Sequence, residues 1–315
     1  MIGYVARRLA QLLPVLLVAS AGIWAMIYAV PGGPAGMIVG ENATPEQVAA
    51  VTHRLGLDRP LLAQYADWLG RAVRGELGVS VYSSEPVAKL IGERLPATLQ
   101  LAVAATVVAL ALGIPAAIIS ALRPGSWLDR LLSVWSAVAL GVPTFWLGML
   151  LVLLFAVELH WLPSASTHVP FWQDPAGALR NLALPALTLG TYVSGILARF
   201  LRASLVAELG ADYVRTAQAK GLPPGQVIGV HVMRNALLPF ITVIGLTMAG
   251  FIGGAVVTEA VFNYPGLGRL LITAIGNRDY PLIQGCLVVM LMIYVGINLI
   301  VDVLYAYVDP RVEYG

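Results

Sequence analysis

The chain has 315 residues, a formal net charge of +2 and a single cysteine, Cys286. It is 58% hydrophobic and only 11% charged, with a mean hydropathy of +0.81, whereas a soluble domain carries about a quarter charged residues. This composition excludes an ordinary soluble domain, the small net charge does not indicate a nucleic-acid partner, and one cysteine excludes a disulfide framework and a thiolate metal site.

Six uncharged stretches dominate the chain, and each is long enough, or nearly so, to cross ~30 Å of hydrocarbon as a helix. They run Leu9–Val30, Ala97–Leu122, Leu131–Val157, Asn181–Ala198, Asn235–Thr258 and Pro281–Val301. The first follows two arginines, as a signal peptide would, but it is too long for a typical signal core, so we expect an uncleaved span. The sequence thus predicts an all-α polytopic membrane protein with six transmembrane helices.

The distribution of Lys and Arg predicts the orientation of these spans, because cytoplasmic loops carry the excess of positive charge. With the N-terminus inside, the inner side holds Arg7, Arg8, Arg123, Arg130, Arg199, Arg202, Arg215, Lys220, Arg234 and Arg311. The short outer loops hold only Arg180, Arg269 and Arg278. Both termini are therefore expected in the cytoplasm, including the tail 307–315.

The polar segment 31–96, between the first two spans, is expected to form a helical extracytoplasmic cap on the core 97–306. Thr44 is expected to cap a helix with Pro45 in its first turn and Gln47 closing a capping box. A second helix is expected in "LDRPLLAQYADWLGRAVRG", and a third is expected from Ser84, with Pro96 leading into span two. The apolar face of the second helix comprises Leu61, Leu62, Tyr65, Trp68, Leu69 and Val73. Such a cap is either a lid over the bundle or a docking surface for a delivered substrate.

The outer segment 258–285 combines the turn-rich "NYPGLG" with the amphipathic "RLLITAI", which predicts a short interfacial or re-entrant helix. An acid at the end of span five, Glu259, needs a partner or water at that depth. A structural role is favoured for Glu259 over direct substrate contact. The best candidates for the outer mouth of a substrate pathway are nevertheless Glu259, Asn263 and Tyr264.

The inner segment 205–235 is longer than a connector between two spans needs to be, and long structured loops usually have a function. Asp212 is expected to cap a helix over Tyr213–Lys220, and Gly221 is expected to end it in the left-handed conformation. Pro223 and Pro224 suit the first turn of a following helix that leads into span five. The loop is therefore predicted to form a helix, a glycine turn and a second helix.

No catalytic motif accompanies this loop. The sequence lacks the phosphate-binding G-x-x-x-x-G-K-[ST] as well as G-x-S-x-G and H-E-x-x-H, and its four histidines are scattered. We expect no catalytic residue, no metal ligand and no cofactor bound by this chain. A helix pair on the inner side without catalytic residues of its own indicates a docking element, which a partner protein binds and moves.

The loop resembles the coupling loop of binding-protein-dependent ABC importer permeases, whose consensus is E-A-A, three residues, G, nine residues, I-x-L-P. Here "RTA", ending at Ala217, stands three residues before Gly221, while Arg215 replaces the glutamate and Met233-Arg234 replace the final L-P. This departure is similar to the dipeptide/oligopeptide/nickel branch. The resemblance covers nearly the whole chain, through "GLDRPLLAQYADWLG", "ERLPATLQLA", "GSWLDRLL", "VPTFWLGMLL", "TEAVFNYPGLGRLL" and "RDYPLIQG".

The resemblance implies a permease in the cytoplasmic membrane of a prokaryote. Its partners would be a second homologous six-span permease, two ABC ATPase domains that hold ATP and Mg, and an extracytoplasmic substrate-binding protein. The inner helix would rest in a groove on one ATPase. The residues implied in this docking are Asp212, Tyr213, Arg215, Ala217, Lys220 and Gly221.

Alternatives remain open from the residues. An ion-coupled secondary transporter would need ionisable residues near the bilayer midplane, but Glu158, Glu259 and Asp302 lie at span ends. An intramembrane hydrolase lacks a nucleophile and base. Within the resembled family, di- or oligopeptides are the expected cargo, with nickel and glutathione as alternatives.

Overall fold

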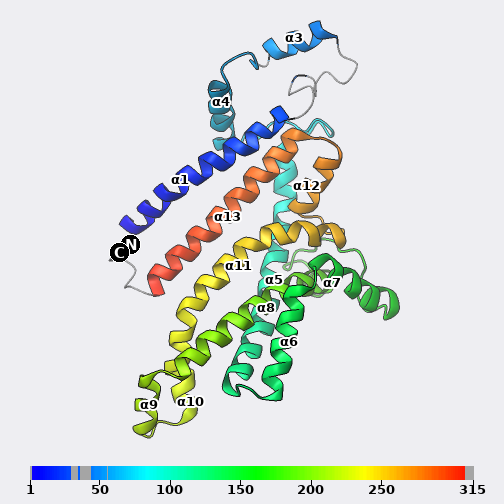
Figure 1. The fold of residues 1–315 in the computed structure, drawn as a ribbon. Helices are drawn as coiled ribbons and strands as arrows, with labels where there is room; N and C mark the ends of the chain where they lie inside the picture. The colour runs from blue at the N-terminus through cyan, green and yellow to red at the C-terminus, as the bar shows by residue number, and fades with distance from the viewer. Residues whose placement is uncertain (1, 30–34, 36–43, 55, 309–315) are drawn as a thin grey trace. The chain divides into compact units, whose positions relative to one another are not determined.

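A computed structural model of the protein describes residues 2–29, 35, 44–54 and 56–308, most of which are helical (Figure 1). The first part contains α1 (Ile2–Ala25), the 3-10 turn η1 (Met26–Ala29), α3 (Pro45–Arg54), α4 (Leu61–Val73) and α5 (Val87–Leu122). The middle contains α6 (Trp127–Gly141), α7 (Thr144–Leu151), the π-helical η2 (Val152–Glu158) and α8 (Pro175–Leu209). The rest contains α9 (Asp212–Ala219), α10 (Pro224–Gln226), the π-helical η3 (Val227–Val232), α11 (Met233–Val261), α12 (Leu267–Gly276) and α13 (Tyr280–Val308). The expected end of span one at Val30, residues 31–34 and 36–43 of the expected cap, and 309–315 of the tail lie outside the described residues.

Four of these helices are long and apolar enough to cross a membrane, and the number rises to six if each of two bent helix pairs is one span. The four are Arg7–Tyr28, Val87–Leu122, Pro175–Leu209 and Tyr280–Val303. The bent pairs are Trp127–Gly141 with Thr144–Glu158, and Pro224–Leu237 with Pro239–Phe251. A helical membrane protein is therefore confirmed, and six is the upper number of spans among the described residues.

The expected third span is bent by 104° between α6 and α7. At the break Val142 is extended (φ −83°, ψ 123°), and Pro143 precedes the first residue of α7. The residue before a proline is driven out of the helical region by the proline ring, so Val142 and Pro143 together end α6. The sequence signal was a continuous apolar run, which does not report this bend.

Two helix expectations for segment 31–96 are settled by the structure. The capping box at the start of α3 is confirmed, because the Gln47 side chain accepts from the Thr44 N–H at 3.0 Å and Thr44 Oγ1 accepts from the Gln47 N–H at 3.4 Å. The third helix begins at Val87 and not at Ser84, and it is continuous with span two, because α5 runs without a break from Val87 through Pro96 to Leu122. A proline removes one helical hydrogen bond, and in a long membrane helix the neighbouring turns compensate for that loss.

The apolar face expected on α4 is only partly buried. Tyr65, Trp68 and Leu69 are half-buried, while Leu61, Leu62 and Val73 are exposed, with Leu62 79% exposed. The buried residue of α4 is Gln64, whose amide donates to the Leu57 and Arg59 carbonyls at 3.0 and 2.7 Å. The Tyr28 hydroxyl donates to Oε1 of Gln64, so both ends of this buried amide have hydrogen-bond partners.

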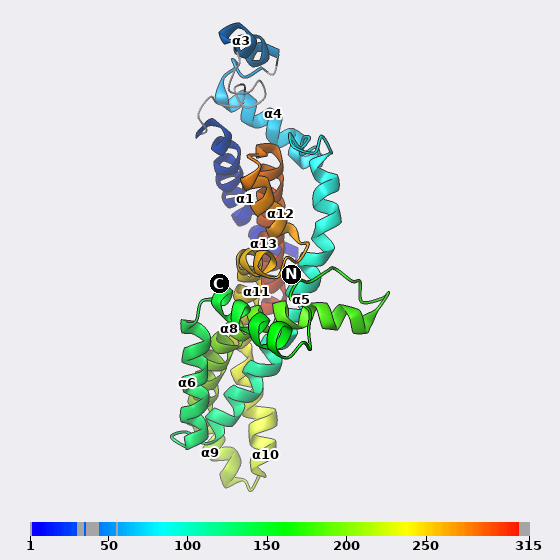
Figure 2. The same cartoon turned by 90° about the vertical axis from the view of Figure 1, so that its right-hand side faces the viewer.

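The chain divides into two compact units. The first consists of the described parts of 1–5, 96–269 and 293–315, and the second of those of 6–95 and 270–292. In the first unit α8 and α11 pack side by side (Figures 1 and 2). Its apolar core includes Leu197, Leu201, Leu205, Val214, Val232, Phe240 and Phe251. The polar segment expected between spans four and five is thus anchored in the core of this unit.

Candidate functional site

The candidate site is the helix–turn–helix segment between α8 and α11. Helix α9 begins two residues after the Gly210 that ends α8, and the chain then passes through Gly221 into α10, η3 and α11. Figures 1 and 2 show α9 and α10 together at the end of the bundle formed by α8 and α11. The expected order of helix, glycine turn and helix is confirmed. The π-helical stretch Val227–Val232, which joins α10 to α11, had no signal in the sequence.

The start of α9 differs by one residue from the expectation. Asp212 is the first helical residue, and the N-cap is Ala211, which offers no side-chain hydrogen bond. The acid still lies in the first turn, where a negative charge is favoured by the helix dipole. Lys220 likewise becomes the C-cap, so α9 ends at Ala219.

Gly221 ends the helix as expected. Its φ is +79°, and its N–H donates to the Gln218 carbonyl at 2.9 Å. The following Leu222 N–H donates to the Ala217 carbonyl at 3.3 Å. Pro223 then precedes Pro224 at the first position of α10, where the absent N–H costs nothing. The turn is therefore fixed by its backbone on both sides of the glycine.

Two side chains attach α9 to the core of its own unit. Val214 is 2% exposed and Ala217 is 9% exposed, and both belong to the same apolar cluster as Val227, Val232 and Phe240. The small side chain of Ala217 therefore lets α9 pack closely against the apolar core of the same chain. Burying a valine stabilises a packed element by about 1.5–3 kcal/mol, so α9 is held in place rather than suspended on a linker.

Tyr213 ties α9 to the last turn of α8. Its hydroxyl donates to Glu208 Oε2 at 2.6 Å. Burial, with Glu208 as a further cause, raises the pKa of Tyr213 above its ordinary value. The phenol thus stays protonated and keeps donating at physiological pH.

The other face of α9 is exposed and polar. It presents Asp212, Arg215 and Lys220, and the Arg215 guanidinium lies 3.9 Å from the Asp212 carboxylate with both side chains largely exposed. An exposed pair of this kind contributes little to stability, so both charges stay accessible to a partner. The arrangement suits docking of another protein and offers no nucleophile or base.

The three outer candidates lie in different surroundings. Glu259 is fully buried at the end of α11 and accepts hydrogen bonds from Thr98 Oγ1 and the Gly268 N–H, each at 2.7 Å, and from the Arg269 N–H at 3.1 Å. Tyr264 is fully buried among apolar residues of α5 and α8, and Asn263 is exposed with a φ of 53°. Glu259 therefore anchors the turn before α12, and the pathway assignment of all three stays a prediction.

Sequence reasoning overlooked two buried acids. Asp279, just before α13, accepts from Ser80 Oγ and from the N–H groups of Val81 and Leu282 at 3.2 and 3.3 Å. Asp129, in the first turn of α6, pairs with Arg202 of α8. Each acid lies in a short polar stretch next to a long apolar run, and this position was the sequence feature that could have singled it out. Among the described residues no group of three or more His, Cys, Asp or Glu side chains is arranged to hold a metal ion.

Known proteins match the sequence of this chain along nearly its whole length. Residues 113–314 match the model of the binding-protein-dependent transport system inner membrane component, and residues 1–102 match the N-terminal model of the same membrane components. A putative peptide transport system permease protein of Brucella abortus is 40% identical over 314 residues, all of both chains. A glutathione transport system permease protein of Escherichia coli O6:H1 is 41% identical over 314 residues, again all of both chains. A dipeptide transport system permease protein of Alkalihalophilus pseudofirmus is 38% identical over 335 residues.

A solved structure shares the fold. The inward-facing MetNI methionine ABC transporter superposes with a TM-score of 0.59 at 20% identity, covering 72% of this chain and 99% of the other. At this identity the likeness concerns the fold alone. The sequence matches over the full length carry the assignment: the chain belongs to the family of binding-protein-dependent transport system inner membrane components.

Proposed function

We propose that this chain is one permease subunit of an ATP-driven importer that moves di- or oligopeptides across the cytoplasmic membrane of a prokaryote. The observation that carries the proposal is the attachment of α9, which is joined to α8 by Tyr213 and to the core by Val214. A helix held in this way moves together with the long helices on either side of it. A partner that displaces α9 therefore displaces membrane helices as well.

The partners that fit this attachment are two ABC ATPase domains, which would bind ATP and Mg, and a second, homologous permease. Asp212, Arg215 and Lys220 supply the exposed charges for a groove on one ATPase, and Gly221 fixes the turn behind them. Tyr213 and Ala217, two further residues of the predicted docking set, support the helix from its inner face. Closure of the ATPase dimer would then shift α8 and α11 between inward- and outward-facing arrangements.

Peptide cargo is favoured by the relatives named as peptide and dipeptide permeases at 38–40% identity over the full chain. Glutathione, itself a small peptide with free carboxylates, is the second candidate because a glutathione permease is 41% identical. An extracytoplasmic binding protein would deliver either cargo to the segment between the first two spans. Glu259, Asn263 and Tyr264 are the residues proposed for the outer mouth of the substrate pathway.

The test is purification of the chain from its native membrane in mild detergent, with every co-purifying subunit identified by mass spectrometry. The complex is then reconstituted in vesicles and supplied with a labelled dipeptide, a tetrapeptide and glutathione, with and without ATP. The proposal expects ATPase subunits, a second permease and ATP-dependent peptide uptake. If the folded chain is isolated alone and uptake is driven by a proton or sodium gradient, the proposal is refuted and the chain is an ion-coupled transporter.

A further inference from the structure

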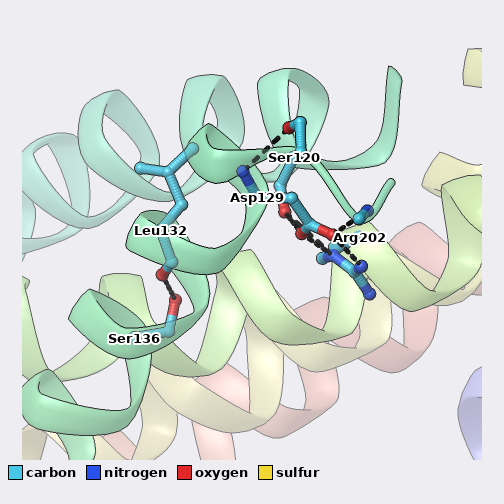
Figure 3. Close-up of polar contacts among 7 residues, drawn as sticks. Ser120, Asp129, Leu132, Ser136 and Arg202 are labelled. Atoms are coloured by element: carbon cyan, nitrogen blue, oxygen red, sulfur yellow. Dashed lines mark hydrogen bonds and ion pairs between the residues drawn. The ribbon is translucent and has the colours of Figure 1, made fainter. Parts of the chain in front are cut away.

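A closed polar network joins α5, α6 and α8 within the first unit (Figure 3). Arg202 Nε and Nη2 donate to Asp129 Oδ1 and Oδ2, both at 2.8 Å, which is a bidentate pair. Ser120 also donates to Asp129, the Gly125 N–H donates to Asp129 Oδ2 at 2.8 Å, and Arg202 Nε contacts Ser120 Oγ at 2.8 Å. The Asp129 side chain is 7% exposed, so a buried carboxylate has both oxygens occupied.

The turn between α5 and α6 is shaped around this carboxylate. Gly125 adopts a φ of +76°, which directs its N–H to Asp129, and Ser126 caps α6 by accepting from the Asp129 N–H at 3.2 Å. An acid in the first turn of a helix is also favoured by the helix dipole. The segment "RPGSWLD" therefore holds Asp129 through its own backbone and through Ser126, in addition to the pair with Arg202.

Close packing extends this connection along α6 and α8. A Cβ added at Gly195 of α8 would lie 3.1 Å from both the Ala139 Cβ and the Ser136 carbonyl oxygen of α6. Ser136 satisfies its own hydroxyl by donating to the Leu132 carbonyl at 2.9 Å, so it adds no polar contact across the interface (Figure 3). The two helices thus meet at the glycine contact and, about two turns further along α8, at the ion pair.

The ion pair lies on the path that leads away from α9. Arg202 stands on α8 shortly before its end at Leu209, and Tyr213 of α9 binds Glu208 in that last turn. Figures 1 and 2 show the turn between α5 and α6 at the same end of this unit as α9 and α10. From Asp129, α6 continues to the bend at Val142 and Pro143. A displacement of α9 therefore reaches α6 through α8 and this pair.

We propose that Asp129 and Arg202 are positioning residues that clamp α6 to α8, so that movement of α9 carries α6 and its bend along with α8. The proposal rests on the function proposed above. If this contact only stabilised the fold, it would need no charges, because buried ion pairs can often be replaced by apolar residues without loss of stability. A bidentate pair instead fixes the relative orientation of two helices, which is what transmission of a rigid movement requires.

The test compares Asp129→Asn and Arg202→Lys with wild type in the complete reconstituted complex. Asparagine keeps the shape of Asp129, and lysine keeps the charge of Arg202 but loses the bidentate geometry. The controls are Arg130→Gln and Arg199→Gln, which remove exposed arginines beside the two clamp residues. Peptide imported per ATP hydrolysed is expected to fall about tenfold in Asp129→Asn, less in Arg202→Lys and not in the controls.

A distance measurement separates transmission from folding. Spin labels at Val138→Cys on α6 and Gln218→Cys on α9, both exposed positions, report the separation of the two helices. In wild type the distance distribution is expected to be narrow and unchanged by ATP, and in Asp129→Asn it is expected to broaden. Variants that assemble, keep the wild-type ratio of import to hydrolysis and keep the narrow distribution would overturn the clamp.

The outcomes for the two proposals are distinguishable. A wild-type complex without ATP-dependent peptide import would refute the proposed function. The clamp would then be judged from the labelled protein alone, where an unchanged distribution in Asp129→Asn refutes it and a broadened one supports it. An equal fall of import and hydrolysis, with the distribution unchanged, would assign the pair to stability only.

Discussion

At Gly221 a side chain would meet open space, because no heavy atom lies within 4 Å of a Cβ added there. The constraint at this position is the backbone, whose φ of +79° disfavours every residue with a Cβ by about 1–2 kcal/mol. A β-branched residue is the least tolerant of it. The turn after α9 thus depends on glycine for its conformation and not for lack of space.

Gly221→Val is therefore expected to abolish peptide import while membrane insertion stays normal, as measured by uptake in vesicles and by membrane fractionation. The matched control is Gly225→Ala in α10, which also has open space around its Cβ but no positive φ. Normal uptake by Gly221→Val would contradict the coupling role of this turn.

The buried carboxylate of Glu259 leads to a different prediction. The carboxylate accepts hydrogen bonds from Thr98, Gly268 and Arg269. It also lies so close to Gly266 that a Cβ added there would collide with it. Removing a buried hydrogen-bonding group leaves its partners unsatisfied, at about 1–3 kcal/mol for each. Glu259→Ala is therefore expected to lower the melting temperature of the detergent-solubilised protein by several degrees.

Asn263→Gly is the control, because glycine keeps the left-handed backbone at this exposed position. It is expected to leave the melting temperature unchanged, so that any loss of import in this variant reports contact with the cargo. A Glu259→Ala protein as stable as wild type would rule out the anchoring role.

At the scale of elements, α9 is held by a small number of buried contacts. Val214→Ala removes two methyl groups, about 1.6 kcal/mol at 0.8 kcal/mol each. Amide hydrogen exchange in the peptide that covers α9 is expected to accelerate about tenfold, because this free energy controls local opening. The exposed Gln218→Ala is expected to leave the exchange unchanged, and equal exchange in both variants would show that Val214 does not hold the helix.

The prolines show how elements depend on their surroundings. Pro96, Pro115 and Pro185 lie inside helices that continue through them, whereas Pro143 stands at a bend of 104° and Pro239 at a bend of 50°. The residue type alone does not separate the two outcomes. The difference lies in whether the neighbouring turns and helices satisfy the freed carbonyl, which is a property of the packing.

At the scale of the whole molecule, the distribution of arginine and lysine predicts which loops face the cytoplasm. Ser83 and Gln218 are exposed, and the predicted orientation places them on opposite sides of the membrane. Each is replaced by a single cysteine in a Cys286→Ala background. A membrane-impermeant thiol reagent added to intact cells is expected to label Ser83→Cys, and Gln218→Cys only after the membrane is opened. Labelling of both positions in intact cells would contradict the orientation.

The sequence by itself determined the class of the protein, the approximate positions of the long helices, the capping box at Thr44 and the left-handed turn at Gly221. These features depend on local chemistry: the hydropathy of a run, a side chain that reaches its own backbone, and the freedom of glycine to adopt a positive φ. Only the tertiary structure decided that Val214 and Ala217 face inward, that Thr98 binds Glu259, and that Asp129 meets Arg202. Those outcomes depend on which groups, distant in the chain, share the same buried space, and a buried charge is stable only where a partner from another element lies within hydrogen-bond distance.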